Sequence, residues 1–208
     1  MKYFVFDIGG VLNNTERKEF KRYLTLKNYY NEKDIEANNF RKELFGEYMK
    51  GKISFEELID IMRPYLIDRD KSAEDYRIEY KNHLKNTSGL YKSSEEVIKK
   101  VKEEGHRVYL LSNLTELDYE LFSESFDTSL LDGAFLSYKL GLLKPGRPIF
   151  DRILYEIGCD PRSMYYFDDK KSNVDSASEC YIHACLTNGN KLSEDVDKTL
   201  IKIKSLKM

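Results

Sequence analysis

Short apolar runs alternate with amphipathic stretches through the second half of the chain. The runs that are typical of buried strands lie at 3–6, 107–111, 134–137, 164–167 and 181–186. Between the later runs, apolar residues recur at helical spacing over 93–104, 115–124, 147–157 and 171–180, and a last helix is expected over 191–205. Because parallel strands need crossover connections of this kind, the alternation predicts an α/β fold with a parallel sheet.

The segment from 15 to 90 has a different pattern and contains no convincing strand. Its apolar side chains fall on one face of a helix at Phe40, Leu44 and Tyr48, and again at Phe55, Leu58, Ile59 and Met62. Pro64 is expected to kink or end the third helix of this segment. We therefore expect an all-helical domain over 15–90, of roughly four helices by this periodicity, inserted into a core formed by 1–14 and 91–208.

Composition and charge narrow the choice of partners. The 208 residues include 34 basic and 36 acidic ones, which gives a net charge of −2. Since there is no basic excess, we expect neither a nucleic-acid partner nor an anionic membrane. No apolar stretch is long enough to span a bilayer, and the N-terminus does not resemble a signal peptide.

The three cysteines form an odd set without the spacing of metal ligands. This argues against a disulfide framework and favours a cytoplasmic protein with reduced thiols. The oligomeric state stays open, with a monomer as the simpler expectation.

Polar residues follow the expected strands where a parallel sheet binds its ligands, beyond the strands' carboxyl ends. The candidates at these positions, or at the starts of the following helices, are Asp7, Gly9, Gly10, Ser112, Asn113, Lys144, Asp168, Asp169 and Asn173. Singly, each has an ordinary structural role, such as a helix cap, a tight turn or a solvated strand end. Together they favour a site for a phosphate group and a metal ion.

The residue types suit phosphoryl transfer. Asp7 can attack phosphorus as a nucleophile. Asp168 and Asp169 would crowd negative charge, which Mg²⁺ neutralises because it prefers oxygen ligands. Lys144 supplies positive charge for the phosphate or for Asp7. Further groups that could bind phosphate oxygens are Ser112, Asn113 and the backbone of Gly9 and Gly10.

Four segments resemble the four motifs of the haloacid dehalogenase-like (HAD) hydrolase superfamily, namely 6–12, 110–113, 141–145 and 167–173. The resemblance implies a Rossmann-like three-layer core and a helical cap that encloses the substrate. It also implies hydrolysis of phosphate esters through an aspartyl-phosphate. The first and last motifs look closest to a branch that includes the alpha-D-glucose-1-phosphate phosphatases, so sugar phosphates are candidate substrates.

The resemblance also implies a role for each matched residue. Asp7 would be the nucleophile. The magnesium ion would be held by Asp7, the backbone carbonyl of Gly9 and Asp169, with Asp168 assisting directly or through water. Asn173 would support these ligands without contacting the ion itself.

One position departs from the family pattern. HAD phosphatases usually carry a second aspartate two residues after the nucleophile, which protonates the leaving group and then activates water. Gly9 occupies that position. General acid–base help is typically worth about 100- to 10,000-fold in rate. Glu16, Glu43 or Glu47 could substitute, and an acidic leaving group would need less protonation.

Three functions are compatible with these residues. The first is a magnesium-dependent phosphatase of small phosphorylated metabolites. The second is a weak or inactive relative that binds a phosphate ligand or another protein. Gly9 suggests it, because glycine replaces the usual acid at this position. The third is a dehalogenase, which the pair Asp168 and Asp169 disfavours because that chemistry needs no metal. We expect the phosphatase.

Overall fold

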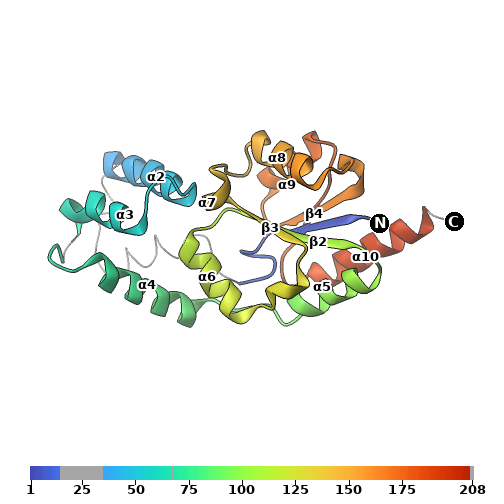
Figure 1. Cartoon of the computed structure of the whole chain (residues 1–208), viewed down its shortest axis with the longest axis horizontal. Coiled ribbons are helices and arrows are strands. Elements are labelled where there is room, and N and C mark those ends of the chain that lie inside the picture. The colour runs from blue at the N-terminus through green and yellow to red at the C-terminus, as the bar shows by residue number, and fades with distance from the viewer. Residues whose placement is uncertain (15–34, 67, 207–208) are drawn as a thin grey trace.

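The chain folds around one parallel sheet (Figure 1). The computed structural model describes residues 1–14, 35–66 and 68–206, and the side chains of the helix at 35–49 from Lys42 onward. In this part of the chain five strands pair in the order β3-β2-β1-β4-β5. They are β1 (Tyr3–Phe6), β2 (Arg107–Ser112), β3 (Gly133–Leu136), β4 (Met164–Asp168) and β5 (His183–Leu186). The predicted α/β fold with a parallel sheet is confirmed.

Strand β1 lies at the centre of the sheet. Phe6, its last residue, pairs with Leu110 of β2 and with Phe167 of β4. All neighbouring strands run parallel, so their carboxyl ends meet at one edge. The residues that follow β1, β2 and β4 are thereby brought together.

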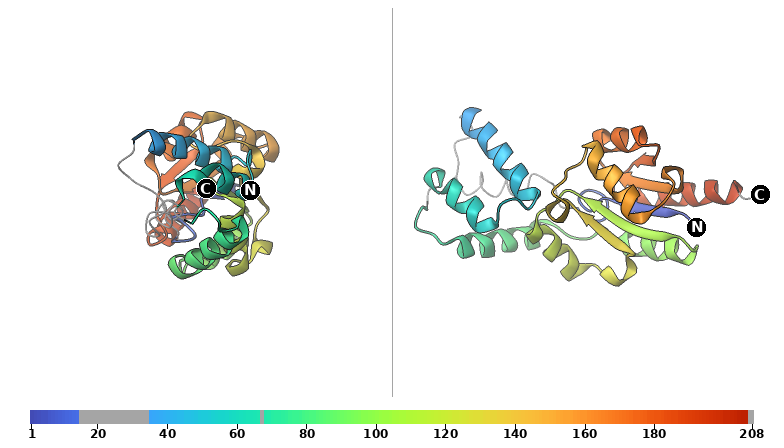
Figure 2. Two further views of the ribbon diagram at one scale, coloured as in Figure 1. Left: turned by 90° about the vertical axis from the view of Figure 1, so that its left-hand side faces the viewer. Right: turned by 45° about the horizontal axis from the view of Figure 1, so that its top comes forward.

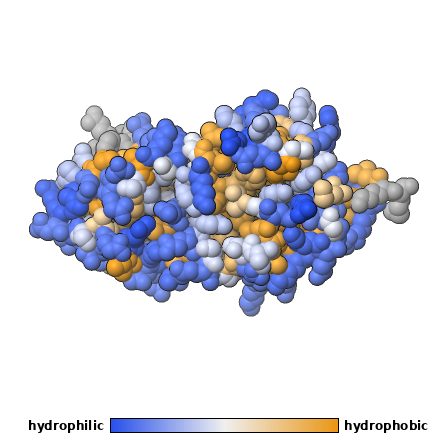
Figure 3. All heavy atoms as spheres, in the orientation of Figure 1, coloured by the Kyte–Doolittle hydropathy of each residue, from blue (hydrophilic) through white to orange (hydrophobic). Residues whose placement is uncertain are grey.

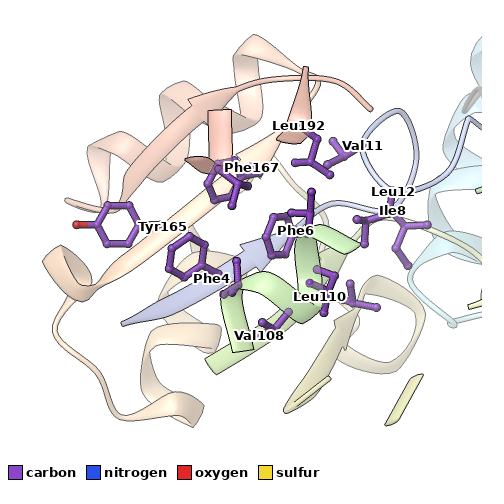
Figure 4. Packing of buried hydrophobic residues seen from close by; sticks show 14 of the residues in the cluster. Phe4, Phe6, Ile8, Val11, Leu12, Val108, Leu110, Tyr165, Phe167 and Leu192 are labelled. Carbon is purple, nitrogen blue, oxygen red and sulfur yellow. The ribbon is translucent and has the colours of Figure 1, made fainter. Parts of the chain in front are cut away.

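Helices cover both faces of the sheet and make three layers. Successive side chains of a strand point to opposite faces. Phe4 and Phe6 therefore join the core on the side of α5 (Ser94–Glu103) and α10 (Leu192–Ser205), where Figure 4 shows their rings beside Phe167. Val5 faces the other core, which is formed with α8 (Arg147–Ile157) and α9 (Lys171–Glu179).

The helical insertion builds a hydrophobic core of its own. Its helices are α2 (Ile35–Met49), α3 (Phe55–Met62) and α4 (Ala73–Thr87), which lie to one side of the sheet (Figures 1 and 2). Ser54 and Glu57 form a capping box at the start of α3. The insertion core also includes Leu117 and Leu121 of α6 (Glu116–Ser125), so the insertion packs against a helix of the sheet domain.

The chain enters and leaves the insertion side by side. The Asn14 N–H donates to the Gly89 carbonyl at 2.9 Å, and the Gly89 N–H donates to Asn14 Oδ1 at 2.6 Å. Asn13 and Leu90 form an antiparallel bridge next to them. The two segments that connect the insertion to the sheet domain, here called the paired crossings, are therefore joined by hydrogen bonds.

Most predicted boundaries agree with the structure within two residues. Pro64 lies in a 3-10 turn, Arg63–Tyr65, which follows directly on α3, so the proline ends that helix. The strand expected from 181 begins at His183, because Tyr181 has a φ of 63° and turns the chain after α9. The strand expected to reach 137 ends at Leu136, where the short helix α7 (Ser137–Leu140) begins. Part of the predicted insertion, 15–34, lies outside the described residues.

The surface is largely polar. Hydrophilic residues cover most of the face in Figure 3, and hydrophobic residues form patches between them. Among the described residues, none of the helices combines the length and the apolar composition that a membrane span requires.

Candidate active site

Three buried polar side chains meet where β1, β2 and β4 end. Asp7 follows β1, Ser112 is the last residue of β2, and Asp168 is the last residue of β4. Asp7 and Asp168 are 0% exposed and Ser112 is 2% exposed. The parallel sheet thus places these predicted site residues together at its carboxyl edge, although 161 positions separate the two aspartates in the sequence.

Asp7 is held by several donors on one carboxylate oxygen. Its Oδ1 accepts the Ile8 N–H at 2.8 Å and the Ser112 hydroxyl at 2.6 Å. The Lys144 ammonium lies 3.1 Å from the same oxygen. A buried carboxylate is stable only when it is paired and hydrogen-bonded, and these groups meet that need while they fix its orientation.

Lys144 lies between two buried carboxylates. Its Nζ is 2.7 Å from Asp168 Oδ2 and donates to the Leu111 carbonyl at 2.7 Å, and its side chain is 0% exposed. Asn113 holds the backbone of Lys144: its Oδ1 accepts the Lys144 N–H and its Nδ2 donates to the Lys144 carbonyl, both at 2.8 Å. Asn113 therefore positions Lys144, and a part for Asn113 in binding phosphate remains a prediction.

Asp168 is surrounded by donors besides Lys144. Asn173 Nδ2 lies 2.9 Å from both of its oxygens. The Lys170 N–H donates to Oδ1 at 2.8 Å, and the Tyr166 hydroxyl donates to Oδ2. With so many donors, Asp168 is better suited to orient Lys144 and Asn173 than to contact a metal ion directly.

The carboxylates can hold a cation. One oxygen each from Asp7, Asp168 and Asp169 lies within 4.8 Å of the others. Clustered carboxylates repel unless a cation neutralises them, and Mg²⁺ prefers such oxygen ligands. The residues present therefore fit magnesium, with Asp7 and Asp169 as the more suitable direct ligands. A ligand role for the Gly9 carbonyl stays a prediction.

Gly10 allows Asp169 to come close to the chain after β1. Gly10 has a φ of 81°, and a Cβ built on it would lie 2.5 Å from Asp169 Oδ2. Its N–H donates to the Asn13 carbonyl at 2.7 Å, and its carbonyl accepts the Gly189 N–H at 2.9 Å. The Gly10 amide thus bonds inside the loop, and its part in phosphate binding stays a prediction.

A cavity of about 160 Å³ opens beside these residues. Its walls include Gly9, Ser112 and Asn113 from the carboxyl edge of the sheet. They also include two residues that the sequence did not single out, Tyr80 of α4 and Asp118 of α6. The cavity therefore joins the candidate site to the junction between the insertion and the sheet domain.

The carboxylates considered as substitutes at Gly9 are less well placed. Glu16 lies outside the described residues, and Glu43 is exposed. Glu47 pairs with Lys50 at 2.9 Å and with Lys52 at 2.8 Å, and these hydrogen bonds, that of Lys50 first, lower its pKa. Such a carboxylate is a poor proton donor, and neither Glu43 nor Glu47 is among the described residues of the cavity.

An α/β protein with a buried Asp–Lys–Asp cluster at the carboxyl edge of its sheet, and helices inserted after the first strand, belongs among the hydrolases with a capped Rossmann-like core. The family model of haloacid dehalogenase-like hydrolases matches residues 1–180. The chain therefore belongs to this family, and it is a HAD-like hydrolase.

Curated relatives are distant in sequence. D-ribitol-5-phosphate phosphatase of Bacteroides thetaiotaomicron is 26% identical over 204 residues, which cover 86% of this chain and 88% of that protein. A drimenol cyclase of Aspergillus calidoustus and a sesquiterpene phosphatase of Aspergillus oryzae are 26% and 28% identical over 65% and 39% of this chain. The chain spans only 26% and 42% of the length of these two proteins.

Solved structures share the fold. A predicted HAD-like hydrolase from Porphyromonas gingivalis superposes with a TM-score of 0.78, at 24% identity over 96% of this chain and 98% of that one. A HAD family enzyme from Bacteroides thetaiotaomicron, in complex with magnesium and inorganic phosphate, has a TM-score of 0.73 at 22% identity, over 91% and 95% of the two chains. At these identities the likeness concerns the fold.

Proposed function

We propose that the protein is a magnesium-dependent phosphatase that hydrolyses small phosphorylated metabolites through an aspartyl-phosphate on Asp7. One observation carries the proposal: a buried aspartate, fixed by Ser112 and Lys144, lies within a cluster of three carboxylates at the carboxyl edge of the sheet. A structural carboxylate would not need two further carboxylates beside it.

The chain's own groups account for most of the reaction. An Asp7 oxygen forms a bond to phosphorus while the bond between phosphorus and the alcohol oxygen breaks, and the leaving oxygen takes a proton from a water molecule, because Gly9 offers no acid. A water oxygen then bonds to phosphorus while the bond from phosphorus to Asp7 breaks, which restores the carboxylate and releases phosphate, and the proton of that water passes to solvent. Lys144 balances negative charge at Asp7 throughout. Bound Mg²⁺ would supply neutralisation of the phosphate and its alignment for in-line attack.

The relatives support this chemistry by analogy. Two of them are phosphatases by name, a D-ribitol-5-phosphate phosphatase and a sesquiterpene phosphatase, and a structural neighbour was solved in complex with magnesium and inorganic phosphate. Sugar phosphates therefore stay the first class to test. The proposal places the enzyme in the cytoplasm, which the three free cysteines support.

The alternative is a weak or inactive relative that binds a phosphate ligand. Gly9 motivates it, because this position lacks the usual acid. The complete set of Asp7, Lys144 and paired aspartates favours the enzyme, since a binding protein would not need a nucleophile held in one orientation.

The test is magnesium-dependent release of phosphate from a panel of sugar, polyol and aryl phosphates. Replacing Asp7→Asn removes the nucleophile and should lower kcat at least about a thousandfold, as losses of catalytic nucleophiles do. Asp197→Asn, on the exposed side of α10, serves as the matched control and should leave the rate unchanged. Undiminished activity of Asp7→Asn would refute the nucleophile, and an inactive wild type across the panel would favour the binding protein.

A further inference from the structure

The cavity next to Asp7 can hold the alcohol part of a phosphate ester. Gly9, Ser112 and Asn113 line it, and Ser112 donates a hydrogen bond to Asp7, the proposed nucleophile. Tyr80 and Asp118 also line it, from helices on either side of the junction between insertion and sheet domain. A phosphate group held at Asp7 would therefore direct its alcohol into this cavity.

Most other described walls of the cavity are apolar. The apolar walls are formed by Ile8, Phe45, Met49, Leu84, Leu114, Leu121 and Phe122, and polar side chains also line the cavity at Asn13, Ser88 and Ser125. Lys85 and Glu124, which are 54% and 47% exposed, pair with each other at 3.0 Å. Ligand pockets are mostly apolar, and a few placed polar groups in them fix orientation and specificity. In this cavity, Tyr80 and Asp118 are two such polar groups, and they hydrogen-bond to each other between α4 and α6.

Asp118 and Tyr80 already form a pair. The Tyr80 hydroxyl donates to Asp118 Oδ1 at 3.2 Å. The other oxygen of Asp118, Oδ2, accepts the N–H of Thr115 at 3.0 Å and its hydroxyl at 2.9 Å. A carboxyl oxygen has two acceptor positions, so Oδ1 can accept a further hydrogen bond.

Burial raises the pKa of Asp118, while the hydrogen bonds from Thr115 and Tyr80 act in the opposite direction. A partly buried carboxyl beside a phenol can accept from a hydroxyl group and, when protonated, donate to one. This matches the chemistry of an alcohol better than that of a second anion.

Helix capping accounts for the contacts of only one carboxylate oxygen of Asp118. With Thr115 it forms the capping box of α6. The capping box of α3, made by Ser54 and Glu57, does the same work at the surface. Capping therefore explains the contacts of Oδ2, but it does not require a tyrosine from the insertion on Oδ1.

We propose that the Asp118–Tyr80 pair recognises a hydroxyl group of the leaving alcohol, which makes the substrate a phosphorylated polyol or sugar. The inference rests on the proposed phosphatase function. Tyr80 and Asp118 are specificity-determining residues in this scheme, because they contact the part of the substrate that does not react.

The experiment compares two esters of five carbons, D-ribitol 5-phosphate and n-pentyl phosphate, of which only the first carries further hydroxyl groups. Wild type, Tyr80→Phe and Asp118→Asn are assayed with both. Each substitution should raise KM for the polyol phosphate about tenfold, the usual effect of one lost hydrogen bond. The KM for pentyl phosphate should change less than about twofold, since no hydrogen bond to this ester is lost.

Tyr76→Phe is the matched control. Tyr76 lies on the same helix, is 0% exposed, and donates its hydroxyl to the Asp68 carbonyl at 2.7 Å. It is not among the described residues of the cavity, so its substitution should leave the preference between the two esters unchanged.

Two outcomes overturn the inference while the phosphatase stands. One is a wild type that hydrolyses pentyl or p-nitrophenyl phosphate but no polyol or sugar phosphate. The other is an equal loss on both five-carbon esters in Tyr80→Phe and Asp118→Asn, which would show a structural or acid–base role. Failure of the wild type to release phosphate from any ester, with magnesium present, would instead reject the proposed function itself.

Discussion

Two adjacent glycines after β1 have different consequences for the site. Gly10 leaves room for Asp169, whose Oδ2 lies 2.5 Å from the position that a Cβ would take. Gly9 lines the cavity at a position where phosphatases of this family usually carry an acid. The missing side chain of Gly10 therefore favours the proposed metal site, whereas that of Gly9 leaves the proposed reaction without its usual proton donor.

Replacing Gly10→Ala should weaken magnesium binding about 10- to 100-fold, as changes beside metal ligands commonly do. The methyl group would push Asp169 away from Asp7. Calorimetric titration with Mg²⁺ measures the effect. Gly158→Ala is the control, because Gly158 also has a positive φ, of 66°, but no atom within 4 Å of an added Cβ. Equal magnesium affinity in both variants would contradict the proposed role of Asp169.

Replacing Gly9→Asp should raise kcat, because it restores a general acid and base worth about 100-fold or more. The gain should be larger for an alkyl phosphate than for p-nitrophenyl phosphate, whose leaving group needs little protonation. Steady-state rates on both esters measure it. If a well-folded variant shows no gain, another group already transfers the proton.

At the scale of the elements, the loop between α2 and α3 contacts the sheet domain closely. The Met49 carbonyl accepts the Ser137 hydroxyl at 2.7 Å. A Cβ on Gly51, whose φ is 65°, would lie 2.1 Å from the Tyr138 carbonyl oxygen of α7. Only glycine allows this approach, so the loop is a contact point between the insertion and α7.

Gly51→Ala should therefore loosen the insertion from the sheet domain. We expect faster amide hydrogen exchange in α7 and at the end of α2, without loss of the sheet. Gly46→Ala is the control, because it lies inside α2 with no atom within 4 Å of an added Cβ. That change should stabilise the helix by about 0.5–1 kcal/mol. Unchanged exchange in Gly51→Ala would show that the contact does not hold the insertion.

The sequence predicted the elements whose signal is local. Buried parallel strands are continuous apolar runs, so the strands around Phe6, Leu110 and Phe167 could be found without a structure. The helix α7 could not, because four residues are too few to show a helical period.

Contacts between distant elements were harder to foresee. Gly10 and Asp169 were each singled out, but their close approach depends on how β1 and β4 pair. Tyr80 and Asp118 lie 38 positions apart and meet only because α4 packs on α6. No pattern in the sequence predicts that α4 packs on α6.

For the whole molecule, magnesium should act as a stabilising ligand. An ion that binds only the folded chain adds about 2.7 kcal/mol at a concentration of 100 times its Kd. For a protein of this length, that corresponds to an increase in Tm of about 5–10 °C. Thermal unfolding with Mg²⁺ and with a chelator measures it.

The increase should vanish in Asp169→Asn and persist in the surface control Asp197→Asn, because only the first removes a proposed ligand. A Tm that does not respond to Mg²⁺ in the wild type would count against the metal site.

The paired crossings at Asn14 and Gly89 bear on how such a protein can diversify. Since the entry and the exit of the insertion are joined by hydrogen bonds, their spacing does not depend on the length of chain between them. Domain insertions succeed where two ends lie close together in this way. The helical segment can therefore differ in length or sequence, while Asp7, six residues before Asn13, keeps the contacts with Ser112 and Lys144 that the sheet domain supplies. Changes in the insertion should then alter the preference for a substrate more than they alter the surroundings of Asp7.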